Sequence, residues 1–238
     1  MRAAVKTAPT SSKKPKRAPF TISIISTIHA HLDAQSPLHI AVYACLTAAF
    51  YATARLGEMT VPNLEAFNPS LYPSRSDLET TMDRSNISTT ILHLPKTKTS
   101  NAGEDIYWTA QEGITDPVSA MNEHLRRNNP HKDAHIFAYM HGKTFRPLTK
   151  RNFMLVVNAA AKQAKLDPMQ GHGIRISSTL EYLLRGLSFE AMRTKGRWVS
   201  NAFSAYVTKH AEILALHTNL GDPLHPLSTQ PALSRART

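Results

Sequence analysis

Cysteine is almost absent from this sequence, which has one, Cys45, among 238 residues. A single cysteine excludes an internal disulfide framework and a cysteine-based structural zinc site, and it fits a reducing compartment. Long apolar runs are absent too. The most apolar stretch, residues 38–54, contains His39 and is short for a membrane-spanning helix, so it predicts a buried core helix. Residues 1–20 lack the apolar segment of a signal peptide, and no membrane partner is expected.

Acidic residues are scarce, because 17 Asp and Glu oppose 28 Lys and Arg, for a formal net charge of +11. This balance favours a polyanionic partner, nucleic acid before an anionic membrane. Most of the excess lies in residues 1–20 and 223–238, which contain basic residues and no acid and are predicted to be disordered tails. The run from Lys13 to Arg17 suits nuclear import or loose phosphate contact, so the nucleus is the expected location. Residues 21–222 are predicted to form one folded domain.

Hydrophobic periodicity predicts a mainly helical body. Helices are expected over residues 22–33, 37 to about 54, 117–127, 149–165, 174–186, 188–195 and 201–208. Asp116 and Pro117 are a typical N-cap and first helical residue. Residues 87–109 change to a period of two around a turn at Gly103, which predicts strands. The expected fold class is therefore mainly α with a small antiparallel β-sheet inserted after the second helix (α+β).

Four separated patches carry side chains suited to one reaction. They are Arg55 with Glu58, Lys96 and Lys98 at the strand turn, His172 with Arg175 at a helix start, and Trp198 followed by Tyr206. Arginine forks bind the non-bridging oxygens of a phosphodiester and stay charged. A tyrosine hydroxyl can form a covalent intermediate, and a lysine can protonate the leaving 5′ oxygen. Neither a metal nor a nucleotide cofactor is needed, and the sequence has no P-loop pattern.

In this order of residues the sequence resembles the tyrosine recombinases, the phage-integrase family. The resemblance covers about residues 21–215 and rests on Arg55 with Glu58, Lys98, His172-x-x-Arg175, Trp198 and Tyr206. The residue pattern from Gly196 to Tyr206 is similar to that of eukaryotic mobile-element recombinases of the Crypton kind. The family's fold is a tyrosine-recombinase catalytic domain.

The resemblance implies a role for each residue. Tyr206 would attack the scissile phosphate and become linked to its 3′ side, while Arg55 and Arg175 hold the non-bridging oxygens. Lys98 would protonate the 5′ oxygen. His172 would assist proton movement, Trp198 would hydrogen-bond at the phosphate, and Glu58 would brace the arginine region. The partner would be double-stranded DNA, usually bound by a homo-tetramer, with no small-molecule substrate.

Each residue also has a simpler interpretation. Arg55 could cap the C-terminal end of the apolar helix, with Glu58 as a surface partner. Lys96 and Lys98 could be solvated charges; Lys98 is the preferred general acid and Lys96 the fallback. His172, Trp198 and Tyr206 could be structural. The cations Lys143, Arg146, Lys150 and Arg151 are a candidate DNA-contacting strip or a solvated face. The histidine pairs His29/His31 and His131/His135 lack further ligands, so no metal site is expected.

Family members usually carry an N-terminal core-binding domain, whereas only about 20 residues precede the predicted body here. That domain is expected to be lost or to lie outside this chain, so weak, salt-sensitive DNA binding is expected. Two further function classes remain open. One is a catalytically inactive or truncated DNA-binding relic of a mobile element, and the other is a type IB topoisomerase-like enzyme.

Overall fold

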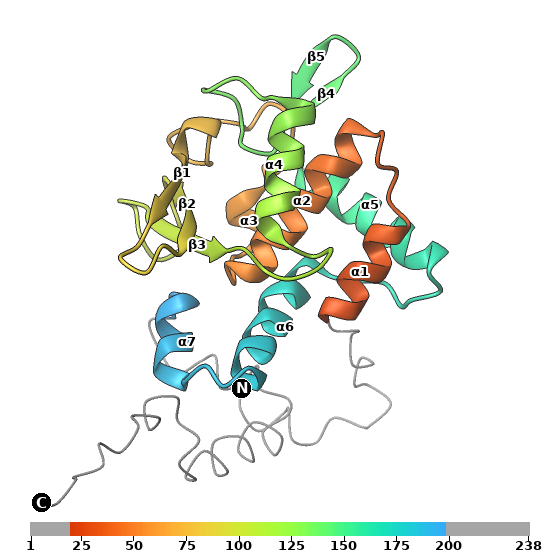
Figure 1. Ribbon diagram of the computed structural model, residues 1–238. Helices are drawn as coiled ribbons and strands as arrows, with labels where there is room; N and C mark the ends of the chain where they lie inside the picture. The colour runs from red at the N-terminus through yellow and green to blue at the C-terminus, as the bar shows by residue number, and fades with distance from the viewer. Residues whose placement is uncertain (1–19, 199–238) are drawn as a thin grey trace, which may run out of the picture. The chain divides into compact units, whose positions relative to one another are not determined.

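A computed structural model describes residues 20–198 (Figure 1). The chain divides into two compact units, residues 1–178 and 179–238. The boundary falls inside helix α6 (Gly171–Leu184). The predicted division into a body over 21–222 and two tails stays a prediction. Within the part of the chain that is described, no helix combines the length and the apolar character needed to cross a membrane.

The first unit is built around one fully buried helix, α2 (Pro37–Tyr51). Ser36 caps its N-terminus, Pro37 occupies the first turn, and every residue from Ile40 to Tyr51 is buried. Helices α1 (Ile22–Ala30), α4 (Pro117–Asn128) and α5 (Lys150–Gln163) surround it. A helix apolar on all sides must be enclosed, and these neighbours enclose α2. The prediction that the most apolar stretch is core and not a membrane anchor is confirmed.

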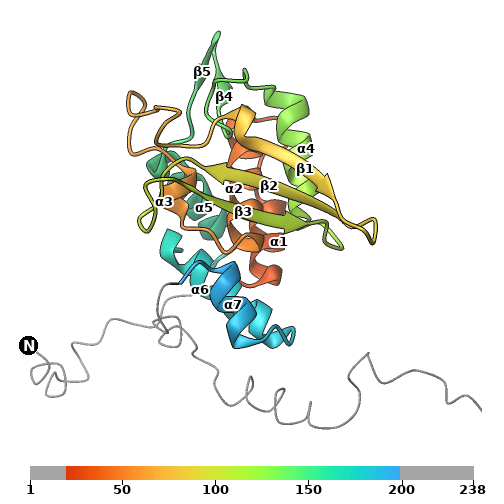
Figure 2. The same cartoon turned by 90° about the vertical axis from the view of Figure 1, so that its left-hand side faces the viewer.

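A three-stranded antiparallel sheet packs beside this helical core. Strands β1 (Leu78–Met82), β2 (Ser88–Leu94) and β3 (Glu104–Thr109) follow one another in space as in sequence (Figure 2). Burial alternates along β2 and β3, with Leu92 paired opposite Ile106 on the buried face. That alternation produces one face toward α2 and α4 and one toward solvent. A second, two-stranded hairpin is formed by β4 (Tyr139–His141) and β5 (Thr144–Arg146).

The second unit begins within α6 and continues through α7 (Phe189–Lys195). Ser188 caps α7, and its side chain accepts a hydrogen bond from the Ala191 N–H. Leu183 and Met192 form a small buried cluster, against which Trp198 packs. This cluster is the local core of the described part of the second unit.

The predicted fold class is confirmed, since helices dominate and a small antiparallel sheet lies among them. Three differences concern element ends. The helix expected to run to about residue 54 ends at Tyr51, the one expected to reach 33 ends at Ala30, and the one expected from 174 begins at Gly171. A short helix, α3 (Leu56–Met59), also lies between α2 and the sheet. The helix predicted over 201–208 lies outside the described residues.

Candidate functional site

Arg55 and both candidate lysines line one cleft in the first unit. The cleft has a volume of about 420 Å³ and lies between α3 and the turn that joins β2 to β3. Its lining residues are Arg55, Gly57, Glu58, Leu71, Tyr72, Lys96, Thr97 and Lys98. Two patches about 40 positions apart in the sequence are thus brought together. Three cations and one carboxylate, Glu58, line this open cleft, which makes it a candidate site for an anion.

Arg55 is fixed at the start of α3 by Glu58. Its guanidinium Nη1 donates to Glu58 Oε1 at 2.7 Å, and its backbone N–H donates to Glu58 Oε2 at 3.4 Å. The Arg55 side chain is 28% exposed, whereas that of Glu58 is only 8% exposed. The alternative in which Glu58 is a surface partner is therefore wrong. Arg55 is also not a cap for the preceding apolar helix; it is the N-cap residue of α3. A buried carboxylate with this geometry holds the guanidinium in one orientation.

The turn between β2 and β3 presents Lys96 and Lys98 on either side of a buried threonine. The Thr97 hydroxyl donates to Glu104 Oε2 and also accepts from the Ser100 N–H at 3.0 Å. The Thr97 N–H donates to the Ser100 carbonyl at 2.9 Å. Because Thr97 is only 7% exposed, its neighbours Lys96 and Lys98 are left exposed at the cleft. Both lysines reach the cleft, so the geometry keeps both as candidates for the general acid.

Gly103 closes this turn and has no room for a side chain. Its φ is +80°, and a Cβ atom there would lie 2.5 Å from the Leu94 carbonyl oxygen. The glycine is required both by the left-handed backbone and by this close approach. The turn that carries the lysines therefore depends on it.

Arg175 is buried at 4% exposure in α6 and is tied to the chain segment that carries Arg55. Its Nη1 donates to the Thr53 carbonyl at 3.2 Å, two residues before Arg55. The Thr53 hydroxyl in turn is 2.8 Å from the Ser178 hydroxyl. His172 lies one turn before Arg175 and is exposed. The structure thus connects the two arginines of the predicted set through Thr53.

The remaining residues of the predicted set lie elsewhere. Trp198 follows α7 in the second unit and folds back over Gly196, where an added Cβ would lie 1.5 Å from the indole ring. Arg197 between them has a left-handed backbone, with φ of 53°. Tyr206 lies outside the described residues. Its predicted role as nucleophile stays a prediction.

The candidate DNA-contacting strip divides between the β4–β5 hairpin and the start of α5. Lys143 and Arg146 belong to the hairpin, whereas Lys150 and Arg151 form the first turn of α5. The start of α5 is attached to the end of α3: Val61 N–H donates to the Leu148 carbonyl and Lys150 N–H to the Val61 carbonyl. The cations of α5 therefore sit at a fixed position relative to α3, the helix that begins at Arg55.

Two histidines, His124 and His135, belong to the buried core. Among residues 20–198 no group of three or more His, Cys, Asp or Glu side chains is placed to hold a metal ion. His124 and His135 are fully buried, and burial lowers the pKa of His124 to about 4 and that of His135 to about 3. The His124 Nε2–H donates to the Ile136 carbonyl, and its Nδ1 accepts from the Asn128 amide.

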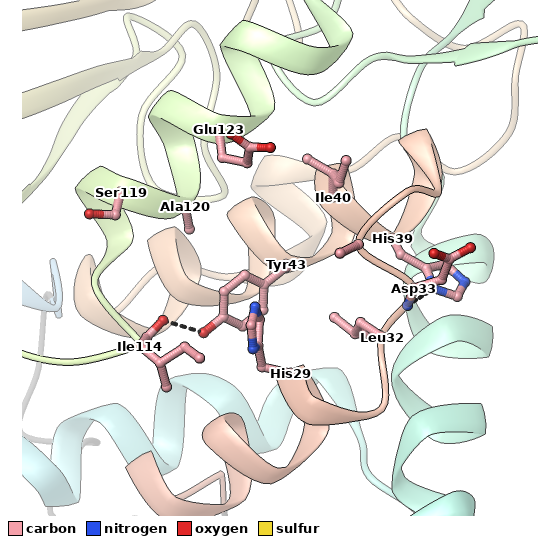
Figure 3. Close-up of a pocket in the computed structure, with 11 residues that line it drawn as sticks. His29, Leu32, Asp33, His39, Ile40, Tyr43, Ile114, Ser119, Ala120 and Glu123 are labelled. Carbon is pink, nitrogen blue, oxygen red and sulfur yellow. Dashed lines mark hydrogen bonds between the residues drawn. The ribbon is translucent and has the colours of Figure 1, made fainter.

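A second cavity, of about 240 Å³, lies between α1, α2 and α4 (Figure 3). The His29 ring contacts Tyr43 in a tilted arrangement, with 4.2 Å between centroids, and the Tyr43 hydroxyl donates to the Ile114 carbonyl at 2.7 Å. Burial lowers the pKa of His29. None of the predicted site residues lines this cavity.

Sequence reasoning missed the residues that organise the cations. Thr97 and Glu104 shape the lysine turn, and Thr53 with Ser178 links the two arginines. Thr97 had a usable signal, since a threonine between two lysines in a strand turn is placed to hydrogen-bond the local backbone. Thr53 and Ser178 had none, because 125 residues separate them.

No protein-family model and no curated protein sequence matches the chain. Solved structures do. The crystal structure of XerA recombinase aligns with a TM-score of 0.57 and 14% identity, over 91% of this chain and 67% of XerA. A complex of FLP recombinase with a Holliday junction aligns with a TM-score of 0.50 and 16% identity, over 79% of this chain and 45% of that one. A Flpe–Holliday junction complex gives 0.52 and 17%, over 81% and 49%. The chain thus spans about two thirds of XerA and about half of the Flp chains, and it has a tyrosine-recombinase-like fold.

Proposed function

We propose that this chain is a DNA breaking and rejoining enzyme of the tyrosine recombinase kind. The observation that supports this most is the placement of its cations. Arg55, Lys96 and Lys98 line one cleft, and Arg175 is bonded to the backbone two residues before Arg55. These residues come from three separate parts of a sequence in which they follow the recombinase order. The fold that holds them is shared with XerA and FLP recombinases.

The reaction is a transfer of a phosphodiester to a tyrosine. The Tyr206 oxygen forms a bond to phosphorus while the bond from phosphorus to the 5′ oxygen breaks. Lys98 gives a proton to that oxygen, and the phenol proton leaves with help from His172. One phosphoester bond is exchanged for another without a net change in bond type, so the step needs no energy from ATP. A second DNA strand's 5′ hydroxyl reverses the step and joins a new partner.

The arginines are proposed to supply the stabilisation that this step needs. Negative charge on the non-bridging oxygens grows as phosphorus becomes five-coordinate. Arg55 lines the cleft, and Arg175, buried and bonded to the Thr53 carbonyl, is the second proposed donor. Fixed hydrogen-bond donors stabilise such charge more than water does because they need no reorganisation. Glu58, buried beneath Arg55, keeps that guanidinium aimed at the cleft. Trp198 adds a donor at the phosphate.

Double-stranded DNA is the proposed partner. Lys96, Lys143, Arg146, Lys150 and Arg151 are proposed to contact phosphates along the flanking duplex. The Holliday-junction complexes of FLP and Flpe support DNA as the ligand of this fold. Assembly as a tetramer, a nuclear location and origin in a Crypton-like mobile element are further parts of the proposal.

A covalent-adduct assay tests the nucleophile. The protein is incubated with a nicked duplex whose short 5′ fragment diffuses away after cleavage, and the products are separated on a denaturing gel. We expect a protein–DNA adduct that is absent from Tyr206→Phe. An adduct of equal intensity in Tyr206→Phe would refute the nucleophile assignment. Absence of any adduct, with duplex binding retained, would indicate a DNA-binding relic. Relaxation of supercoiled plasmid by monomers would indicate a topoisomerase-like enzyme.

A sulfur-substituted substrate distinguishes Lys96 from Lys98. A thiolate leaves without needing a proton, so a substrate with sulfur at the bridging 5′ position no longer needs the general acid. We expect Lys98→Ala to slow adduct formation on the oxygen substrate by about 100-fold and to recover on the sulfur substrate. Lys96 is also exposed and lines the same cleft, so Lys96→Ala is the matched control and is expected to show no such recovery. The reverse result would assign Lys96 as the acid.

A further inference from the structure

Helix α2 ends with an unexpected residue in a tight backbone turn. The Thr53 N–H donates to the Phe50 carbonyl at 3.0 Å, and the Ala54 N–H donates to the Ala49 carbonyl at 2.9 Å. These two bonds form a Schellman motif, whose left-handed position follows the C-cap. Here that position is Thr53, with φ of 53°. Glycine is the usual residue there, because a Cβ atom makes this backbone conformation unfavourable.

A β-branched residue is among the least suited to this conformation. It persists only where the surrounding structure fixes it, and such residues concentrate at functional sites. Thr53 is fully buried, and its hydroxyl lies 2.8 Å from the hydroxyl of Ser178, which is fully buried as well. The end of α2 is thereby joined to α6 by a side-chain bond that glycine cannot make.

The carbonyl of Thr53 makes the second connection. It accepts from Arg175 Nη1 at 3.2 Å, with Arg175 4% exposed. A guanidinium is planar and its donors have a fixed geometry, so a bond at Nη1 also sets the direction of its other donors. A left-handed residue turns its carbonyl away from the helix axis, and this turn is what directs the oxygen toward Arg175. The strained backbone and the arginine contact are therefore one feature.

Arg55 lies only two residues beyond Thr53, so the same turn determines where α3 and its arginine begin. A second contact fixes this region against α6. A Cβ atom added at Gly171 would lie 2.5 Å from Leu56 Cδ2, which shows how closely the start of α6 approaches α3. The two arginines are thus held relative to one another through Thr53, although 120 positions separate them in the sequence.

We infer that Thr53 is a positioning residue that sets the Arg175 guanidinium relative to Arg55 in the anion site, through its left-handed carbonyl and its bond to Ser178. The inference rests on the proposed function, in which both arginines bind the scissile phosphate. On this inference a threonine, which is unfavourable in a left-handed conformation, is retained in place of glycine because its hydroxyl joins the turn to Ser178 and so keeps the two arginines aligned.

Three variants test this. Thr53→Gly suits the left-handed backbone and removes the hydroxyl, Thr53→Ser keeps the hydroxyl, and Ser178→Ala removes its partner. The matched control is Ser177→Ala, which removes a neighbouring buried hydroxyl that accepts from the Phe20 N–H at 2.8 Å. Each full-length protein is assayed for melting temperature, for the rate of adduct formation on the nicked duplex, and for affinity to a fluorescein-labelled 20-base-pair duplex by anisotropy.

We expect Thr53→Gly to melt within about 3 °C of the unsubstituted protein, because relief of the backbone offsets the lost bond. Its adduct rate is expected to fall by about 10- to 100-fold, the usual effect of a misplaced catalytic group. Thr53→Ser is expected to restore the rate to within about threefold, and Ser178→Ala to reproduce much of the loss. Ser177→Ala is expected to lower the melting temperature by a few degrees with little change in rate.

Failure of this inference differs from failure of the proposed function. If the unsubstituted protein forms an adduct and Thr53→Gly forms it equally fast, Thr53 is a structural residue only. If the unsubstituted protein forms none, the proposed function fails, and the duplex affinities decide. If Thr53→Gly binds the duplex about tenfold more weakly and Thr53→Ser binds it normally, the result supports Thr53 as a positioning residue within an anion site. Equal duplex affinities for the unsubstituted protein and Thr53→Gly would refute the inference.

Discussion

Mild acid is expected to destabilise the protein well before its carboxylates protonate, because His124 and His135 are buried in the neutral state. Their pKa values fall from the ordinary 6.5 to about 4 and about 3, chiefly because burial disfavours the charged ring. The hydrogen bond between His124 and Asn128 opposes protonation as well. His124 Nδ1 accepts from the Asn128 amide nitrogen, and that amide cannot flip because it also donates to Pro37 and accepts from Met140. A protonated ring would place two donors face to face.

Proton binding by the unfolded chain determines the direction and size of this loss of stability. Well above pH 6.5 both rings are neutral in the folded and unfolded states, and the two histidines have no effect on the free energy of unfolding. At lower pH the histidines of the unfolded chain bind protons, whereas those of the folded protein stay neutral. The free energy of unfolding therefore falls as the pH drops toward the folded pKa values. At about pH 5.5 each histidine lowers the free energy of unfolding by about 1.4 kcal/mol. Together the two histidines lower the free energy of unfolding by about 3 kcal/mol at this pH. This is a large part of the total free energy of unfolding of a typical protein, which is about 5–15 kcal/mol.

Urea unfolding followed by circular dichroism measures this. With a slope of about 2 kcal/mol per molar urea, the midpoint is expected to fall by about 1.4 M between about pH 7.5 and 5.5. His124→Gln keeps one donor and one acceptor but does not titrate, and it should lose about half of this pH dependence. His141→Gln, at an exposed histidine, is the matched control. An unchanged pH dependence in His124→Gln would show that His124 is not buried neutral.

Two further predictions concern the lysine turn and the core. Gly103→Ala is expected to lower the free energy of unfolding in urea by about 2–3 kcal/mol, because the new Cβ atom meets the Leu94 carbonyl and φ is unfavourable. Gly113→Ala is the control: its φ is +83° but the space around it is open, so the loss should be only about 1 kcal/mol. Equal losses would show that the close approach at Gly103 is unimportant. Cys45 is fully buried and its thiol pKa is raised, so a thiol reagent should modify it only as fast as the protein unfolds; rapid labelling of the native protein would contradict the buried position.

The long helices could be predicted because their apolar residues form a clear pattern. The short elements were difficult to predict because they are exposed or too short to show one. Helix α2 was located by its continuous apolar run after Pro37, and α4 and α5 by apolar residues at helical spacing. Strand β1 was missed because four of its five residues are exposed, which leaves no alternation to detect. The helix α3 is too short, at four residues, to show a helical period. The end of α2 was placed too late because nothing in the sequence marks Thr53 as the left-handed residue.

The sequence predicted which cations line the candidate site, but it did not predict the residues that hold those cations in place. The order of Arg55, Lys98 and Arg175 along the chain indicated one anion site, and Arg55 and Lys98 do line one cleft. That Glu58 is buried beneath Arg55 was not predicted, since an acidic residue three positions after an arginine usually lies on the surface. The bond from Arg175 to Thr53 joins residues 122 positions apart, a separation at which local patterns carry no information.

The same long-range bonds determine when the site can form. The first unit is closed by bonds between Phe20 and Ser177, Thr53 and Ser178, and Thr53 and Arg175, with separations of 157, 125 and 122 positions. Contacts of such high order are made late in folding, because long loops must close first. During synthesis the cleft with its lysines emerges early, while the bonds to α6 await the last residues of the unit. A nascent or prematurely terminated chain would therefore expose cations that attract DNA but would lack the arginine alignment needed to act on it.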